Sequence, residues 1–331
     1  DEDDSPSYPL DLYYNEGDGY VSVWTQNMAG GLPSSEITGV SELKIGTYRL
    51  DSAVSFNKRY ARRSRLDIVS KAVERLAQEV LVKQERNAWA VIIKAMVDGA
   101  TPTSVVTATG NAPTNLQHVY ANDTKGGAFN LHLLNLLLRK HKRMNESFAG
   151  GTPVSPYSSG LTDLFVSPEV MADIRAFSYN PVRTDSGTTN LNSQNLPESV
   201  REEIWRSGGM SSIMGITVHE LMELGIKKKY NELFVATVAG ASTTTVPDLV
   251  AGTARTPVRA EDEVMIGIDR SRGAFIRPVA RNADSGATFV ALPDDQWNLN
   301  RLDKAGFYGS MEEGRVCLDA RAIMGIMLDG A

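Results

Sequence analysis

The sequence is poor in the residues that carry disulfides, metal sites and membrane spans. Its single cysteine, Cys317, cannot form a disulfide within the chain, which indicates synthesis in a reducing cytoplasm. In the strand-like run 315–318 this cysteine is expected to be a small core residue. No run of about 18 apolar residues occurs, so no transmembrane helix is predicted. The first residues show neither a secretory signal nor an initiator methionine, which predicts proteolytic trimming or a numbered segment of a longer gene product.

Histidines are also few, and they do not stand at metal-ligand spacing. His219 and Glu220 begin like the zinc-protease signature, but Glu223 occupies the place of the second histidine that would chelate the metal one helical turn later. His219 is therefore expected at a surface or an interface. Phosphate-binding loops, dinucleotide fingerprints and nucleophile elbows are absent from the sequence. We accordingly expect no catalytic residue, no cofactor and no metal.

Charge is present in local clusters on a chain of net charge -6, so the whole molecule is not an electrostatic binder of nucleic acid. Basic residues gather at 58–65, 139–143 and 227–229. Such clusters contact phosphate, attach to an acidic neighbour or form a solvated face. The acidic residues 1–4 offer one partner. The residues assigned to an inter-subunit contact are Lys44, Arg49, Lys58, Arg59, Arg62, Arg63 and Arg65.

The N-terminal part of the chain lacks the apolar mass for a core of its own. Residues 1–17 are acidic and rich in Pro and Tyr, and they are expected to form an extended arm. Residues 19–29 and 40–56 have an extended pattern, interrupted by glycine and proline. Two such runs predict a long hairpin that projects and lies on a neighbour.

A long helix over 64–98 is the clearest local prediction. Apolar residues from Leu66 to Met96 recur at multiples of three or four, and Gly99 follows the last turn. A second helix is expected over 128–147, with a basic last turn. Further on, Ser167 is expected to cap a helix that starts at Pro168, and a short helix is expected near 198–205. Strands are predicted at 164–166, 216–218, 233–235, 264–268, 274–276, 288–290 and 314–318. The order indicates an α+β protein whose first 60 or so residues reach outward.

This order of elements resembles the Hong Kong 97-type capsid fold of tailed bacteriophages. Residues 164–175, LFVSPEVMADIR, are similar to the strand-then-helix step of its axial domain. Residues 307–323, FYGSMEEGRVCLDARAI, are similar to the closing strand of its peripheral domain. The resemblance implies an N-terminal arm over 1–18, an E-loop hairpin over 19–63, a spine helix and the start of the peripheral domain over 64–127, an axial domain over 128–290 and a return to the peripheral domain over 291–331.

What the resemblance implies is a structural protein and not an enzyme. Such chains self-assemble into hexamers and pentamers of an icosahedral head that encloses double-stranded DNA without sequence specificity. Their partners are scaffolding, portal and decoration proteins, and assembly takes place in the host cytoplasm, which places the product in the virion. Some members crosslink Lys to Asn between subunits, for which Lys44 and Lys58 lie in the hairpin region, with no Asn or Glu partner assigned.

Three other functions compete with the capsid hypothesis. An encapsulin-like shell has the same fold and holds a cargo enzyme in place of DNA. An enzyme would be a monomer or small oligomer with a pocket. A nucleic-acid-binding protein would use the basic run at 58–65 and would bind with strong salt dependence.

Overall fold

The computed structural model describes two compact units of the chain. Unit 1 comprises residues 1–15, 19–91 and 275–316, and unit 2 comprises residues 16–18, 92–274 and 317–331. The described residues are 6–9, 42–62, 67–99, 118–122, 129–146, 160–179, 198–208, 212–241, 243–249, 255–280, 288–293, 299, 301–318 and 320–328.

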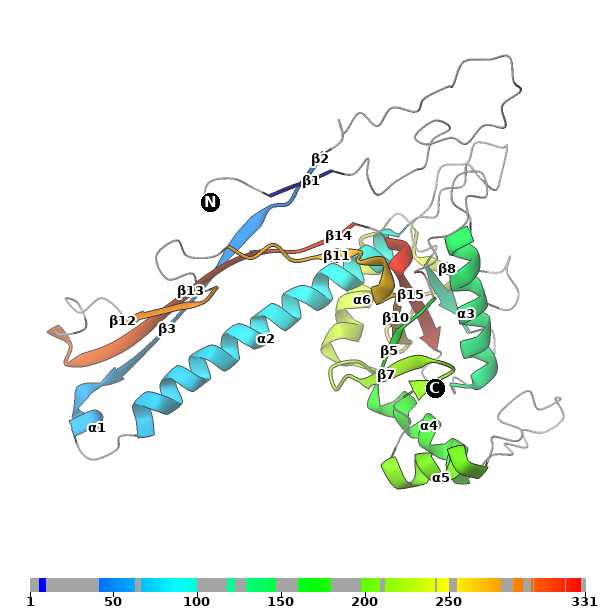
Figure 1. The fold of residues 1–331 in the computed structure, drawn as a ribbon, viewed down its shortest axis with the longest axis horizontal. Helices are drawn as coiled ribbons and strands as arrows, with labels where there is room; N and C mark the ends of the chain where they lie inside the picture. Colours follow the sequence, from blue (N-terminus) through cyan, green and yellow to red (C-terminus); the bar gives the residue numbers. More distant parts are fainter. Residues whose placement is uncertain are drawn as a thin grey trace, which may run out of the picture. The chain divides into compact units, whose positions relative to one another are not determined.

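Unit 1 is built on a three-stranded antiparallel sheet (Figure 1). β3 (Thr47–Asn57) pairs over its whole length with β13 (Lys304–Gly314), and β12 (Val290–Pro293) pairs with the other edge of β13. The two long strands come from opposite ends of the sequence, and each contributes eleven residues. Their pairing fixes the N-terminal and C-terminal parts of the chain to each other.

The long helix α2 (Asp67–Asp98) packs on this sheet through its first part. Leu76 and Val80 are buried, and Gln84 Nε2 donates a hydrogen bond to Met311 Sδ at 2.6 Å. A β-carbon on Gly309 of β13 would lie 2.4 Å from the Phe289 ring and 3.1 Å from Leu76. A side chain at this position would displace the Phe289 ring and press against Leu76 of α2, so glycine lets both side chains lie close to β13.

Shorter elements complete unit 1. β1 (Ser7–Pro9) and β2 (Glu42–Lys44) form an antiparallel pair, and α1 (Lys58–Arg62) follows β3 directly. β11 (Phe275–Ile276) and β14 (Val316–Cys317) form another two-stranded sheet. The first extended run of the predicted hairpin, 19–29, lies outside the described residues, as does most of the predicted arm. The boundaries assigned to the arm and the E-loop stay predictions.

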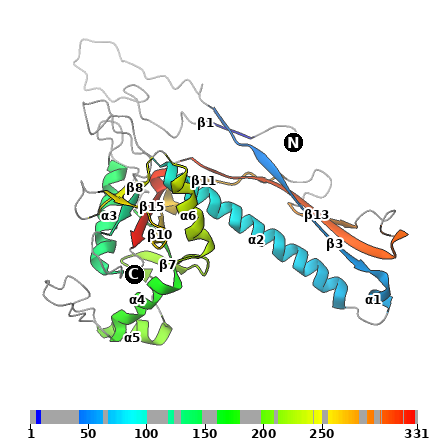
Figure 2. The same ribbon diagram turned by 180° about the vertical axis from the view of Figure 1, so that it is seen from behind.

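Unit 2 contains a mixed six-stranded sheet (Figure 2). Two adjacent inner strands, β10 (Glu263–Ile268) and β15 (Ile323–Leu328), are antiparallel and buried at every position. The six strands lie in the order β4 (Val119–Ala121), β15, β10, β5 (Asp163–Val166), β7 (Ile216–Glu220) and β6 (Ser212–Ile213).

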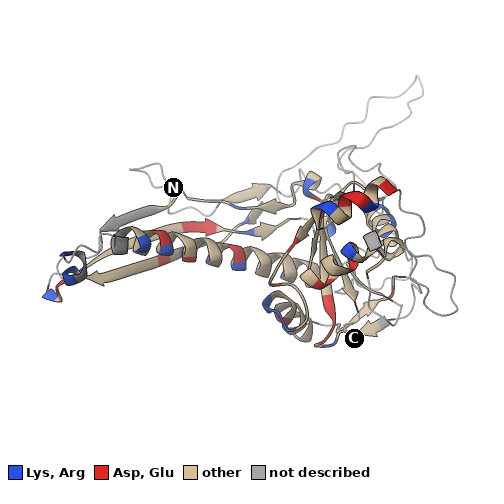
Figure 3. Ribbon diagram, turned by 90° about the horizontal axis from the view of Figure 1, so that it is seen from below, with Lys and Arg blue, Asp and Glu red and all other residues tan. Residues whose placement is uncertain are grey.

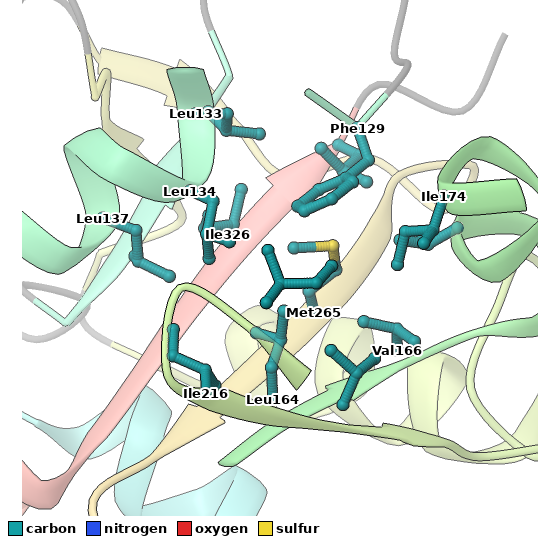
Figure 4. Close-up of a cluster of buried hydrophobic side chains, with 14 of the residues drawn as sticks. Phe129, Leu133, Leu134, Leu137, Leu164, Val166, Ile174, Ile216, Met265 and Ile326 are labelled. Atoms are coloured by element: carbon teal, nitrogen blue, oxygen red, sulfur yellow. The ribbon is translucent and has the colours of Figure 1, made fainter. Parts of the chain in front are cut away.

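Helices supply the rest of the unit 2 core. Leu134, Ile174, Met265 and Ile326 belong to one buried apolar cluster on the sheet (Figure 4). Asn231 links another helix to β10, because its side chain donates to the Asp262 carbonyl oxygen at 2.7 Å and accepts from the Val264 amide at 3.1 Å. The helices are α3 (Leu131–Glu146), α4 (Pro168–Tyr179), α5 (Glu198–Ser207) and α6 (Lys229–Ala239). β8 (Thr245–Pro247) and β9 (Arg255–Pro257) form a small antiparallel pair, for which no strand was predicted from the sequence.

Most elements predicted from periodicity are confirmed, including α2, α3 and α4. The Ser167 hydroxyl accepts a hydrogen bond from the Val170 amide at 3.1 Å, so the predicted cap is confirmed. The predicted strand at 233–235 is wrong, because these residues lie in α6. Three adjacent apolar residues do not define a period, whereas burial of Tyr230, Phe234 and Val238 at helical spacing does.

Candidate inter-subunit surface

The cations that the sequence assigned to an inter-subunit contact do not form one cluster. Lys44 is exposed in β2, and Arg49 is exposed in β3. α1 carries Lys58, Arg59 and Arg62 at the far end of β3. Arg63 and Arg65 lie outside the described residues. Arg49 and α1 are separated by eight residues of extended strand, or about 26 Å.

Arg49 is engaged within its own chain. Its Nε lies 2.8 Å from Asp51 Oδ1, and its Nη2 donates to the Tyr308 hydroxyl at 2.6 Å. Tyr308 in turn donates to Asp51 at 2.6 Å, and this hydrogen bond is the main reason that the pKa of Asp51 lies below its ordinary value. Arg49 thus helps to join β3 to β13 across an exposed face.

A cationic surface lies at the other end of these two strands. We define the tip as α1 together with the turn 301–304, and Figure 3 shows basic residues at this end of unit 1. The Asn57 side chain accepts a hydrogen bond from the Arg59 amide at 2.9 Å, which starts the helix. The Lys58 amide donates to the Asp303 carbonyl oxygen at 2.9 Å, which ties the helix to the turn. Leu302 is 62% exposed in this turn.

Sequence reasoning missed the second half of the tip. Arg301 and Lys304 join the cations of α1 only because Lys304 pairs with Asn57 in the β3–β13 ladder. The local sequence does not predict that Arg301 and Lys304 lie beside α1. Their position depends on the register in which β3 pairs with β13, and neither strand alone specifies that register. A prediction of the β3–β13 pairing would have found both residues.

Unit 1 also contains a buried charge cluster around Glu313. The carboxylate is fully buried and lies 2.8 Å from Arg277 Nη2 and 3.1 Å from Arg315 Nε. It also accepts a hydrogen bond from the Tyr48 hydroxyl at 2.9 Å. Burial alone would raise the pKa of Glu313, but the hydrogen bonds from Arg315, Tyr48 and Arg277 together hold it below its ordinary value. The cluster joins β3, β13 and the segment after β11.

His219 belongs to a comparable cluster in unit 2. Its Nε2 lies 2.7 Å from Asp163 Oδ1, and Arg270 Nε lies 2.6 Å from Asp163 Oδ2. Burial alone would raise the pKa of Asp163, but hydrogen bonds from Thr162, His219 and Arg270 hold it below its ordinary value. The His219 ring also stacks on Phe165, with 5.0 Å between ring centroids. The arrangement fixes neighbouring strands to each other.

Metal and membrane chemistry find no support in the described ranges. Among the residues that the structure describes, no group of three or more His, Cys, Asp and Glu side chains is placed to hold a metal ion. None of the helices in the described part of the chain combines the length and the apolar composition that a membrane crossing requires.

Glu263 is a buried carboxylate in unfavourable surroundings. It opens β10, is 6% exposed, and its Oε1 has no hydrogen-bond partner. Burial raises its pKa above the ordinary value, and the nearby charges of Glu169 and Asp173 on α4 add to the effect. Only a hydrogen bond with Ser167 opposes the shift. The ionised form of Glu263 therefore destabilises the folded chain at neutral pH.

We expect Glu263→Gln to raise the urea midpoint of unfolding at pH 7. The ionised Glu263 carboxylate lowers the free energy of unfolding by its full amount when the pH is above the pKa of Glu263 in the folded chain. This destabilisation is absent below the pKa of the unfolded chain, about 4.3 for Glu. The gain should therefore shrink as the pH falls towards 4. Glu261→Gln, at an exposed position just before β10, is the control and should leave the midpoint unchanged. A lower midpoint for Glu263→Gln at pH 7 would contradict this account.

Known structures are similar to the chain in fold, at low sequence identity. The capsid asymmetric unit of cyanophage Pam1 is 12% identical, with a TM-score of 0.53 over 99% of this chain and 85% of that chain. The capsid of cyanophage P-SCSP1u is 13% identical, with a TM-score of 0.52 over 93% and 80%. The holo-SrpI encapsulin complex from Synechococcus elongatus PCC 7942 is 11% identical, with a TM-score of 0.41 over 86% and 74%. No family model and no curated protein matches the sequence.

The two cyanophage capsid structures define the fold class of this chain. It has the α+β Hong Kong 97-type capsid fold, as the order of its elements predicted.

Proposed function

We propose that this chain is a structural shell protein, and specifically the major capsid protein of a phage head. The observation that carries the proposal is the fold, because the two cyanophage capsid structures cover 99% and 93% of the chain. The elements of unit 1 agree with it. A long helix on a sheet with a charged end offers surface to neighbouring copies, and heterologous contacts of this kind close into rings and shells.

The finer proposal is a set of hexamers and pentamers that form an icosahedral head around double-stranded DNA. Scaffolding, portal and decoration proteins would be its partners, and the virion its location. The assigned arm, E-loop, spine helix, peripheral domain and axial domain belong to the same proposal. The inter-subunit role falls to the exposed cations of the tip, above all Arg59 and Arg62. The alternative is an encapsulin-like compartment that holds a cargo enzyme.

The contents of the particle test this proposal. We expect the protein, expressed with its scaffolding and packaging partners, to sediment as large particles that protect DNA from added nuclease. Particles that contain a co-purifying enzyme and no protected DNA would favour the encapsulin-like alternative. A protein that stays a monomer or small oligomer with all partners supplied would contradict both shells.

A further inference from the structure

The tip concentrates positive charge on an otherwise acidic chain. It holds Lys58, Arg59, Arg62, Arg301 and Lys304 against one acid, Asp303. Of 34 basic and 40 acidic residues in the chain, 29 basic and 39 acidic residues lie elsewhere. The tip of one copy is therefore attracted to acidic segments of another copy over distances of about 8 Å at physiological salt.

The tip also offers an apolar group to its partner. Leu302 is 62% exposed, and the turn that presents it is held by hydrogen bonds from Lys58 to Asp303 and from the Leu302 amide to the Leu299 carbonyl oxygen, the latter at 3.1 Å. The aliphatic carbons of a polypeptide can cover this leucine side chain, whereas a phosphate backbone turns its charged oxygens towards its partner. A polypeptide partner fits this surface better than DNA.

The densest acidic segment in the sequence is Asp1-Glu2-Asp3-Asp4. This segment is too far along the chain from the tip of the same copy to bind it. The Ile45 amide donates to the Pro6 carbonyl oxygen at 3.0 Å, so Pro6 lies beside the residue that precedes β3. Figures 1 and 2 both place β1 and β2 beyond the end of β3 that is opposite α1. From Pro6, five residues span at most about 18 Å. The eleven residues of β3 alone extend about 36 Å towards the tip.

We infer that the tip of one copy binds the acidic segment 1–4 of a neighbouring copy. The contact joins guanidinium groups of Arg59 and Arg62 to carboxylates, with Leu302 against the adjoining backbone. This inference rests on the proposed assembly and names the partner of its cationic surface. Single exposed ion pairs are weak, so the contact depends on several pairs that act together and on its repetition around the shell.

Disulfide trapping tests the contact in assembled protein. The background is Cys317→Ser, which removes the single native thiol. In particles of Asp3→Cys with Arg62→Cys, mild oxidation should produce a ladder of covalent dimers and higher oligomers on a denaturing gel. Asp3→Cys with Glu79→Cys, at an exposed position on α2, is the matched control and should remain monomeric.

Charge exchange provides an independent readout. Arg59→Glu with Arg62→Glu should lower the yield of particles roughly threefold or more, and adding Asp3→Lys with Asp4→Lys should restore it. The inference is overturned if particles form but oxidation gives no ladder, or if the Asp3→Lys and Asp4→Lys substitutions do not restore the particle yield. Either result leaves the shell proposal standing. A loss of protected DNA in tip variants without a ladder overturns it in favour of phosphate contact. A ladder in small oligomers that never form particles supports the contact and contradicts the shell.

Discussion

Glu313→Gln is expected to destabilise the folded chain by about 3 kcal/mol at pH 7. The substitution removes the charge that Arg277 and Arg315 share and leaves the shape of the side chain almost unchanged. Arg315 is 14% exposed, so water cannot fully replace the lost carboxylate. Breaking a buried ion pair by removing one partner is costly because the other charge is left uncompensated. Urea unfolding, followed by tryptophan fluorescence, measures the loss.

The pH dependence of this loss identifies its cause. The folded pKa of Glu313 lies below its ordinary value, so the stabilisation is complete above the unfolded pKa of about 4.3 and is lost as the pH falls through the folded value. The difference between parent and variant should narrow below about pH 4. Glu312→Gln is the control, because the carboxylate of this neighbour accepts an exposed hydrogen bond from the Thr47 hydroxyl. Equal effects of the two substitutions at pH 7 would contradict a special role of Glu313.

Leu134→Ala is expected to cost about 2–5 kcal/mol of stability, chiefly through the cavity that it leaves. Leu134 is fully buried on α3 and belongs to the apolar cluster with Leu164, Met265 and Ile326 (Figure 4). The surrounding side chains come from several strands and helices, so the site cannot collapse by moving one element. Comparison of urea midpoints and slopes measures the change.

Asn135→Ala supplies the matched control for Leu134. The residue is adjacent on α3 and exposed, so its truncation should change the free energy of unfolding by less than about 0.5 kcal/mol. A small effect of Leu134→Ala, with an unchanged slope, would mean that α3 is not anchored on the sheet as described.

Local periodicity accounts for what the sequence predicted well. The spacing of Val73, Leu76 and Val80 specifies a helix by itself, and Ser167 specifies the start of α4 by its own hydroxyl. The strand predicted at 233–235 failed because three apolar residues fit either period.

Non-local pairing accounts for the residues that the sequence did not reveal. Glu313 stands in an ordinary acidic run. Arg315 is two residues away in the sequence, but only the fold brings Tyr48 of β3 and Arg277 beside the carboxylate. Arg301 reaches the tip for the same reason. These sites depend on contacts between the two ends of the chain, and neither end contains the pattern alone.

The size of the assembled protein tests the central proposal most directly. Light scattering followed by negative-stain microscopy of the expressed chain, with its scaffolding partner supplied, gives the answer in one preparation. The shell proposal predicts closed particles or capsomer rings, with diameters on the order of hundreds of ångströms for the closed particles. A monomer or dimer at every salt concentration, with the scaffolding partner present, would contradict it.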